Sequence, residues 1–126
     1  MAGPQDRLTG DALLEAVTDA LAGLHERHYG RRPRSARSQL VQDELLACVM
    51  GDVYTDVEKT LIELQRRPLV HESRSTFQYA MRGRLIAAVE RLSGRTVQTF
   101  FSTHHVGPDM EVEIFLLEPP LAASRA

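Results

Sequence analysis

The amino-acid sequence predicts an α+β fold, a two-layer sandwich in which helices cover one face of a mixed or antiparallel sheet built from two hairpins. Apolar residues recur at helical spacing over 8–29 and 70–93, which indicates two long amphipathic helices. Strand-like patterns fill 35–51 and 97–117, and polar turn residues interrupt each of them. With a short helix before the second long one, the expected order is α-β-β-α-α-β-β.

The length of 126 residues, with 43% hydrophobic and 25% charged residues, is typical of one globular domain. We therefore expect a single domain over 1–126, with an ordered core at about 8–118 and frayed termini. No apolar run approaches the roughly 20 residues that cross a bilayer, so no membrane insertion is expected. The net charge of −2 is too balanced for nucleic-acid binding by bulk charge alone, and the lone Cys48 fits a reducing cytoplasm.

The first helix is expected from about Leu8 to Tyr29. Thr9 is a suitable N-cap residue, and Gly30, followed by Pro33, provides the stop. One face of this segment carries an apolar stripe at spacings of three and four, formed by Leu14, Val17, Leu21 and Leu24.

The first hairpin is expected between Ser35 and Gly51, with the polar Gln42-Asp43-Glu44 as its turn. Its second strand runs from Leu45 to Met50 and is apolar on both faces. Such a strand lies centrally in a sheet or is covered on both sides.

Two helices are expected next. Thr55-Asp56-Val57-Glu58 has the pattern of a capping box and opens a short helix through about Gln65. Arg66-Arg67-Pro68 is expected to end it. A longer helix from about Val70 to Ser93 precedes the stop residue Gly94, and one of its faces carries Phe77, Met81, Leu85, Ala88 and Leu92.

The second hairpin pairs a strand with alternating Val97, Thr99 and Phe101 against a strand in which Val112, Ile114 and Leu116 alternate with Glu111 and Glu113. Since the helices cover only one sheet face, we expect an apolar patch on the other. Phe115 and Leu117 point away from Ile114 and Leu116, and we take Phe115 and Leu117 as candidates for a homodimer interface on that uncovered face.

Five arginines around the end of the first helix form the densest run of one charge: Arg27, Arg31, Arg32, Arg34 and Arg37. Guanidinium groups bind phosphates and carboxylates through paired hydrogen bonds, so this arginine cluster is a candidate site for an anionic partner. The alternative is a solvated face with Glu26 as its local counter-ion.

His104 and His105 are candidate functional residues in a turn that ends in Asp109. Imidazole and carboxylate suit zinc, but adjacent residues of an extended strand point to opposite sides. His25 and His28 could share a metal on the first helix, although the helix dipole also favours histidine near a helix end. We therefore predict no metal site and no cofactor.

Motifs of catalysis are missing from the sequence. It contains no Gly-rich phosphate loop, no nucleophile elbow and no paired Cys metal motif. Cys48 lies in the apolar run 45–50 and is expected to be a small buried side chain. We therefore predict that the protein is not an enzyme.

Several segments together resemble a small bacterial family, the Na⁺-translocating membrane potential protein MpsC. They are His25 to Pro33, Ser35-Ala36-Arg37, Glu58 to Leu61, Phe77 to Arg82, Ala87 to Arg95, Ser102 to Asp109 and Val112 to Glu118. The resemblance covers about 8–119 and departs from the family pattern at Gly51-Asp52-Val53-Tyr54. It implies a link to membrane potential and cation-coupled uptake, but it transfers no catalytic residues.

Two hypotheses about function follow. The first is a cytoplasmic, non-enzymatic accessory or regulatory protein, a homodimer that docks to a membrane-associated or cytosolic protein. The alternative is a nucleic-acid-binding module, since the order of elements is similar to that of type II KH-like folds. A KH domain carries a GXXG loop between its paired helices, whereas this junction reads Gln65-Arg66-Arg67-Pro68, which makes nucleic acid the less favoured partner.

Overall fold

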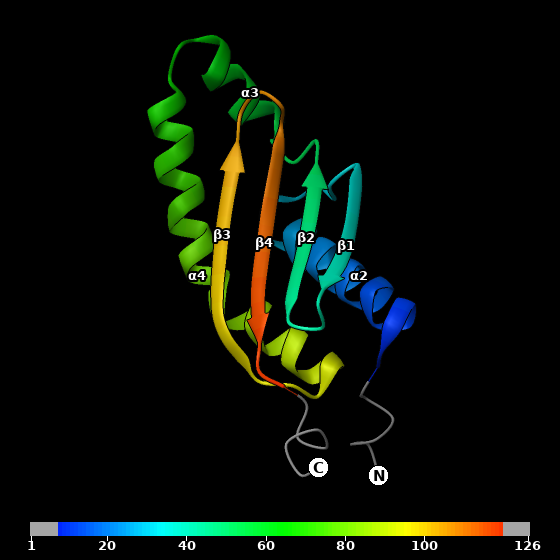
Figure 1. Ribbon diagram of the computed structural model, residues 1–126. Helices are drawn as coiled ribbons and strands as arrows, with labels where there is room; N and C mark the ends of the chain where they lie inside the picture. Colours follow the sequence, from blue (N-terminus) through cyan, green and yellow to red (C-terminus); the bar gives the residue numbers. More distant parts are fainter. Residues whose placement is uncertain (1–7, 120–126) are drawn as a thin grey trace.

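A computed structural model describes residues 8–119 and confirms the α+β class and the order α-β-β-α-α-β-β (Figure 1). The expected frayed termini fall outside the described residues. The elements are α2 (Gly10–Tyr29), β1 (Ser35–Val41), β2 (Leu45–Gly51), α3 (Asp56–Glu63), α4 (Arg67–Ser93), β3 (Val97–His105) and β4 (Met110–Leu117).

The four strands form one antiparallel sheet in the order β1-β2-β4-β3. Each hairpin contributes its second strand to the centre, where β2 pairs with β4 and Val49 lies opposite Val112. The apolar run of β2 is therefore central, as the sequence predicted. β1 and β3 are the edge strands (Figure 1).

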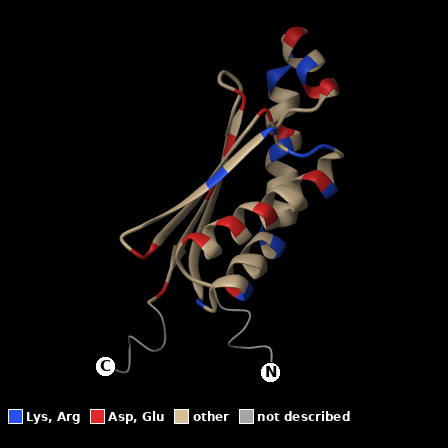
Figure 2. Ribbon diagram, turned by 90° about the vertical axis from the view of Figure 1, so that its right-hand side faces the viewer, with Lys and Arg blue, Asp and Glu red and all other residues tan. Residues whose placement is uncertain are grey.

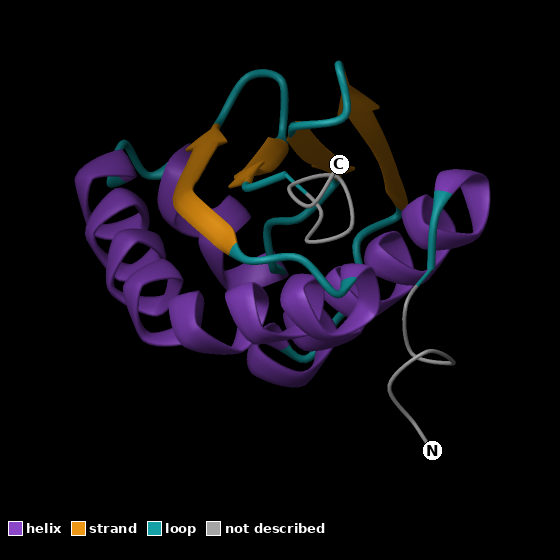
Figure 3. Ribbon diagram, turned by 60° about the horizontal axis from the view of Figure 1, so that its bottom comes forward, coloured by secondary structure: helices purple, strands orange, loops and turns teal. Residues whose placement is uncertain are grey.

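The helices of the described residues all lie on one face of the sheet, which leaves the other face open (Figures 2 and 3). α2 runs beneath β1 and β2, and α4 packs against α2 and β3. Between the two layers lies a core that includes Val17, Leu21, Leu46, Cys48, Met50, Met81, Leu85, Val89, Phe115 and Leu117.

The helix boundaries follow local chemistry. The capping box opens α3 with both of its hydrogen bonds, between Thr55 and Glu58. α4 begins at Arg67, earlier than expected, because Pro68 occupies the first turn, where a missing N–H costs no hydrogen bond. Gly30 and Gly94 end α2 and α4 in the left-handed conformation, with φ of 80° and 69°.

The sheet faces of β4 correct one sequence-based prediction. Phe115 and Leu117 are 0% and 2% exposed and pack beneath the helices, so they cannot form a dimer interface on the open face. Ile114 and Leu116 occupy the open face instead. Because side chains alternate along a strand, Glu111 and Glu113 share the helix-facing side with Phe115 and are buried.

Candidate functional site

The side chain of Arg74 lies at the centre of the molecule, on α4, and is fully buried. Its guanidinium group donates two hydrogen bonds to Glu58 on α3, with Nε 2.7 Å from Oε2 and Nη2 2.6 Å from Oε1. This two-point geometry offsets much of the cost of removing both charges from water. Although burial acts against it, contact with Arg74 lowers the pKa of Glu58 below its usual value.

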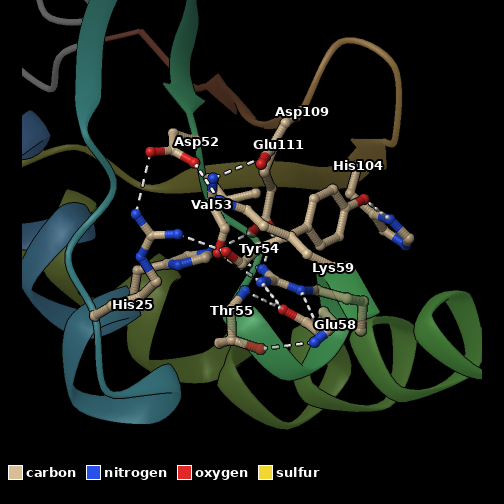
Figure 4. Close-up of polar contacts among 12 residues, drawn as sticks. His25, Asp52, Val53, Tyr54, Thr55, Glu58, Lys59, His104, Asp109 and Glu111 are labelled. Carbon is tan, nitrogen blue, oxygen red and sulfur yellow. Dashed lines mark hydrogen bonds and ion pairs between the residues drawn. The ribbon is translucent and has the colours of Figure 1, made fainter. Parts of the chain in front are cut away.

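The same guanidinium group ties α4 to the sheet. Nη1 lies 3.1 Å from Glu111 Oε1 on β4, and Nη2 donates to the carbonyl oxygen of Val53 at 2.8 Å. The rings of Tyr29 and Tyr54 flank it, with centroids 3.9 and 4.8 Å from Cζ. Arg74 therefore joins α4, α3, the sheet and the loop after β2 through one buried charge, and Figure 4 shows its partners Val53, Glu58 and Glu111.

Two carboxyl groups and a histidine complete this buried cluster. His25 Nε2 lies 3.1 Å from Glu111 Oε2, and the Ser102 hydroxyl is 2.9 Å from Glu113 Oε1. Burial favours a neutral acid, but His25, the neighbouring Glu113 and Arg74 together lower the pKa of Glu111 to about 2. Burial and the adjacent Glu111 raise the pKa of Glu113 well above its usual value, which favours the protonated, neutral form of this carboxyl group.

A line of side chains leads from the buried cluster to the surface. The Tyr54 hydroxyl lies 3.0 Å from His104 Nδ1 (Figure 4), and His104 Nε2 lies 3.3 Å from His71 Nδ1. Burial of the imidazole, and then the neighbouring His71, lower the pKa of His104. His104 is thus a neutral bridge between β3, α4 and the loop after β2 at physiological pH.

The predicted histidine turn is divided by the fold. His104 faces the helices, whereas His105 is exposed on the other side of β3, as alternation along a strand requires. Asp109 accepts a hydrogen bond from the Val53 N–H at 2.8 Å and joins neither histidine. Within residues 8–119, no three histidine, cysteine or acidic side chains are grouped to hold a metal ion.

The predicted arginine cluster is also divided. Arg31 and Arg34 both contact Asp52, and hydrogen bonds from Arg31 and then from Lys59 lower the pKa of this carboxyl group. Arg32 pairs with acidic side chains of α2, Arg37 lies on the open sheet face, and Arg27 lies beside α4. Arg32, Arg34 and Arg37 line one surface hollow, whereas Arg27 lies apart from it beside α4.

The family assignment comes from a comparison with protein-family models. Residues 9–119 match the model of the Na⁺-translocating membrane potential-generating system (MpsC). The chain belongs to the MpsC family. The searches of curated proteins and of solved structures gave no match. None of the helices in the described part of this MpsC-family chain is long and apolar enough to cross a membrane.

The open sheet face is the second notable feature of this MpsC-family chain. Its two central strands present apolar side chains, which are Leu45, Ala47 and Val49 on β2 and Val112, Ile114 and Leu116 on β4. The edge strands add Phe101, which is 57% exposed, and Val41, which is 49% exposed. Polar positions on the same face, Arg37, Gln39, Thr99, Thr103 and His105, lie on the edge strands. An apolar centre with a polar rim is typical of protein interfaces.

Sequence reasoning missed most of the buried cluster. It interpreted Glu111 and Glu113 as polar positions alternating with core residues and did not single out Arg74. The available signal was that Glu111, Glu113, Phe115 and Leu117 share one face of a strand, so a core containing Phe115 must also contain both acids. The prediction that Cys48 is buried is confirmed, and burial raises the pKa of its thiol to about 11.

Proposed function

We propose that this protein is a small, non-enzymatic accessory or regulatory protein of a Na⁺-translocating membrane-potential-generating system. It acts in the cytoplasm as a homodimer joined through the open sheet face, and it docks to a membrane-associated protein. The observation that carries the proposal is the apolar centre of that face, formed by β2 and β4. The family supplies the link to membrane potential.

The size of the open face supports a second copy as its occupant. Strands of 7 to 9 residues, at a rise of about 3.3 Å and a spacing of about 4.8 Å, cover roughly 500 Å² of flat area. Because the side chains project from this plane, the accessible surface area of the face is larger than the flat area. The total approaches the roughly 800 Å² per partner that a standard interface buries, and two-fold dimers are the commonest symmetric assembly.

The chemistry of the buried cluster supports a non-enzymatic role. Arg74 forms ion pairs with Glu58 and Glu111, and all three side chains are buried between the helices and the sheet. A catalytic acid or base must instead reach a substrate within hydrogen-bonding distance. Arg31, Arg32 and Arg34, which a nucleic-acid-binding module would use, pair with acidic side chains of the protein itself, which favours the accessory role over the nucleic-acid alternative.

Light scattering after size-exclusion chromatography tests the dimer. The wild type is expected at twice the mass of the chain at tens of micromolar. Ile114→Lys places a charge in the centre of the apolar face and should give a folded monomer. Tyr79→Lys, at an 81% exposed position of α4, is the matched control and should remain dimeric. A wild type at the mass of one chain would overturn the dimer.

Docking is tested by capture from the native membrane fraction with the wild type as bait. We expect an integral membrane protein of a cation-transport system to be retained. Retention only of ribosomal RNA or other nucleic acid, with a steep dependence on salt, would instead favour the nucleic-acid alternative.

A further inference from the structure

A groove of about 740 Å³ runs between α2 and α4. The two helices are antiparallel there, since the Leu8 N–H bonds to the Leu92 carbonyl at one end and Tyr29 packs on Phe77 at the other. Small or aliphatic residues form much of its lining, namely Ala20, Gly23, Leu24, Ala87 and Ala88. Figure 2 shows this helical layer from the side, with the sheet on the opposite side of the molecule.

Three arginines stand around this groove: Arg27 from α2, and Arg84 and Arg91 from α4. All three are exposed. Elsewhere in residues 8–119, Arg31, Arg32, Arg34, Arg74 and Arg95 pair with acidic side chains, but none of the ion pairs in this part of the chain involves Arg27, Arg84 or Arg91. Asp19 also lines the groove, but its carboxylate pairs with Arg32. The groove therefore carries uncompensated positive charge.

His28 shows that two of these charges converge at one end of the groove. Arg84 Nη1 lies 3.2 Å from His28 Nε2 and donates to it when the imidazole is neutral. Partial burial lowers the pKa of His28 most, and the positive charges of Arg84 and then of Arg27 lower it further. An anionic group bound beside His28 would relieve the repulsion between the two arginines.

The spacing of the charges selects the kind of anion. Arg84 and Arg91 are seven residues apart on one helix, a separation of about 10.5 Å along the axis. One phosphate or one carboxylate could contact both only if the two side chains bent toward each other along the helix. A helix with acidic residues two turns apart matches both arginines, and the small side chains of Ala87 and Gly23 allow its backbone to come close.

We propose that the groove between α2 and α4 binds an acidic amphipathic helix of a protein partner. Its carboxylates pair with Arg27 and Arg84 at one end and with Arg91 at the other, and its apolar face packs on the floor formed by Ala20, Gly23 and Ala87. This inference deepens the proposed docking function by assigning the surface and the partner's chemistry, and it rests on that function. The surface lies on the opposite side of the molecule from the proposed dimer face.

Selection from a display library of helical peptides tests the proposal. The wild type should enrich peptides with Glu or Asp seven residues apart opposite an apolar face. A selected peptide should bind Arg84→Gln/Arg91→Gln at least about tenfold more weakly. The control Arg66→Gln/Arg67→Gln makes the same change in net charge at exposed positions outside the groove and should bind like the wild type.

Two further measurements keep the test independent of charge and of folding. Ala87→Trp fills the floor without changing any charge and should also abolish peptide binding. Titration of His28 by NMR should show that bound peptide raises its pKa, because carboxylates offset the charges of Arg27 and Arg84. If Ala87→Trp still binds the peptide, or if the pKa of His28 does not change on binding, the peptide lies elsewhere and the proposal is overturned.

The outcomes separate this inference from the dimer. Ile114→Lys should bind the selected peptides as tightly as the wild type, so failure of the dimer leaves the groove testable. Enrichment of neutral or basic peptides would contradict the proposal. A second result would also contradict it: no acidic peptide is enriched, and the protein floats with phosphatidylglycerol vesicles only when Arg84 and Arg91 are present. The anion would then be a lipid surface.

Discussion

Arg74 and Glu58 join α4 to α3 through a two-point ion pair, with donor–acceptor distances of 2.7 and 2.6 Å, inside the protein. The same capping box that begins α3 orients Glu58, whose Oε1 also accepts the Thr55 N–H at 2.8 Å. A local helix-start signal and a distant buried cation thus share one carboxylate. The position of α3 depends on both.

Arg74→Met should destabilise the fold by about 3–5 kcal/mol, because it leaves the buried carboxylates of Glu58 and Glu111 without their cation. Urea unfolding measures this loss. Arg67→Met, an exposed change on the same helix, should cost less than about 0.5 kcal/mol. A loss below about 1 kcal/mol for Arg74→Met would mean that the two acids take up protons at little cost.

Glu113→Gln should stabilise the protein, and the gain should grow as the pH rises above about 4.5. In the wild type the unfolded Glu113 carboxyl group ionises in that range, whereas the folded one keeps its proton to a higher pH because its pKa is raised. The native state therefore binds the extra proton, and wild-type stability falls with increasing pH. Unfolding free energies of both proteins between pH 4 and pH 8 test this, and a difference that does not vary with pH would contradict it.

His104 should titrate below the usual range of histidine, and His71→Gln should raise its pKa. The substitution removes a neighbouring imidazole but leaves the contact with the Tyr54 hydroxyl. Since the folded pKa is depressed, the stability contributed by neutral His104 is present above about pH 6.5 and is lost as the pH falls through the folded value. NMR titration of the ring protons measures the pKa, and an unchanged value in His71→Gln would exclude the coupling.

Arg31→Gln should destabilise the protein more than Arg34→Gln. Arg31 donates to the buried carbonyl oxygen of Tyr54 as well as to Asp52, whereas the side chain of Arg34 is 81% exposed. Loss of a charged hydrogen bond to a carbonyl costs about 1–2 kcal/mol, and loss of an exposed ion pair costs less than about 1 kcal/mol. Thermal unfolding of the two variants compares them directly, and equal losses would show that Arg31 acts only as a surface charge.

The local sequence determined the elements of this protein. Apolar spacing placed α2 and most of α4, Gly30 and Gly94 marked their ends, and the capping box of Thr55 and Glu58 marked the start of α3. The continuous apolar run of β2 also predicted its central place in the sheet. These features depend on interactions within a few residues or on the need to bury apolar surface, and both can be read from a single segment.

Only the tertiary structure decided which face of β4 meets the helices. Alternation allows Ile114 or Phe115 to lie inside, and local hydrophobicity favours the side without Glu111 and Glu113. Arg74 and His25 come from other segments and compensate Glu111, and the raised pKa of Glu113 favours its neutral form, so the acidic face becomes the buried one. The apolar side chains of Val112, Ile114 and Leu116 then lie on the open face, because compensation of a buried charge depends on partners that a single segment does not contain.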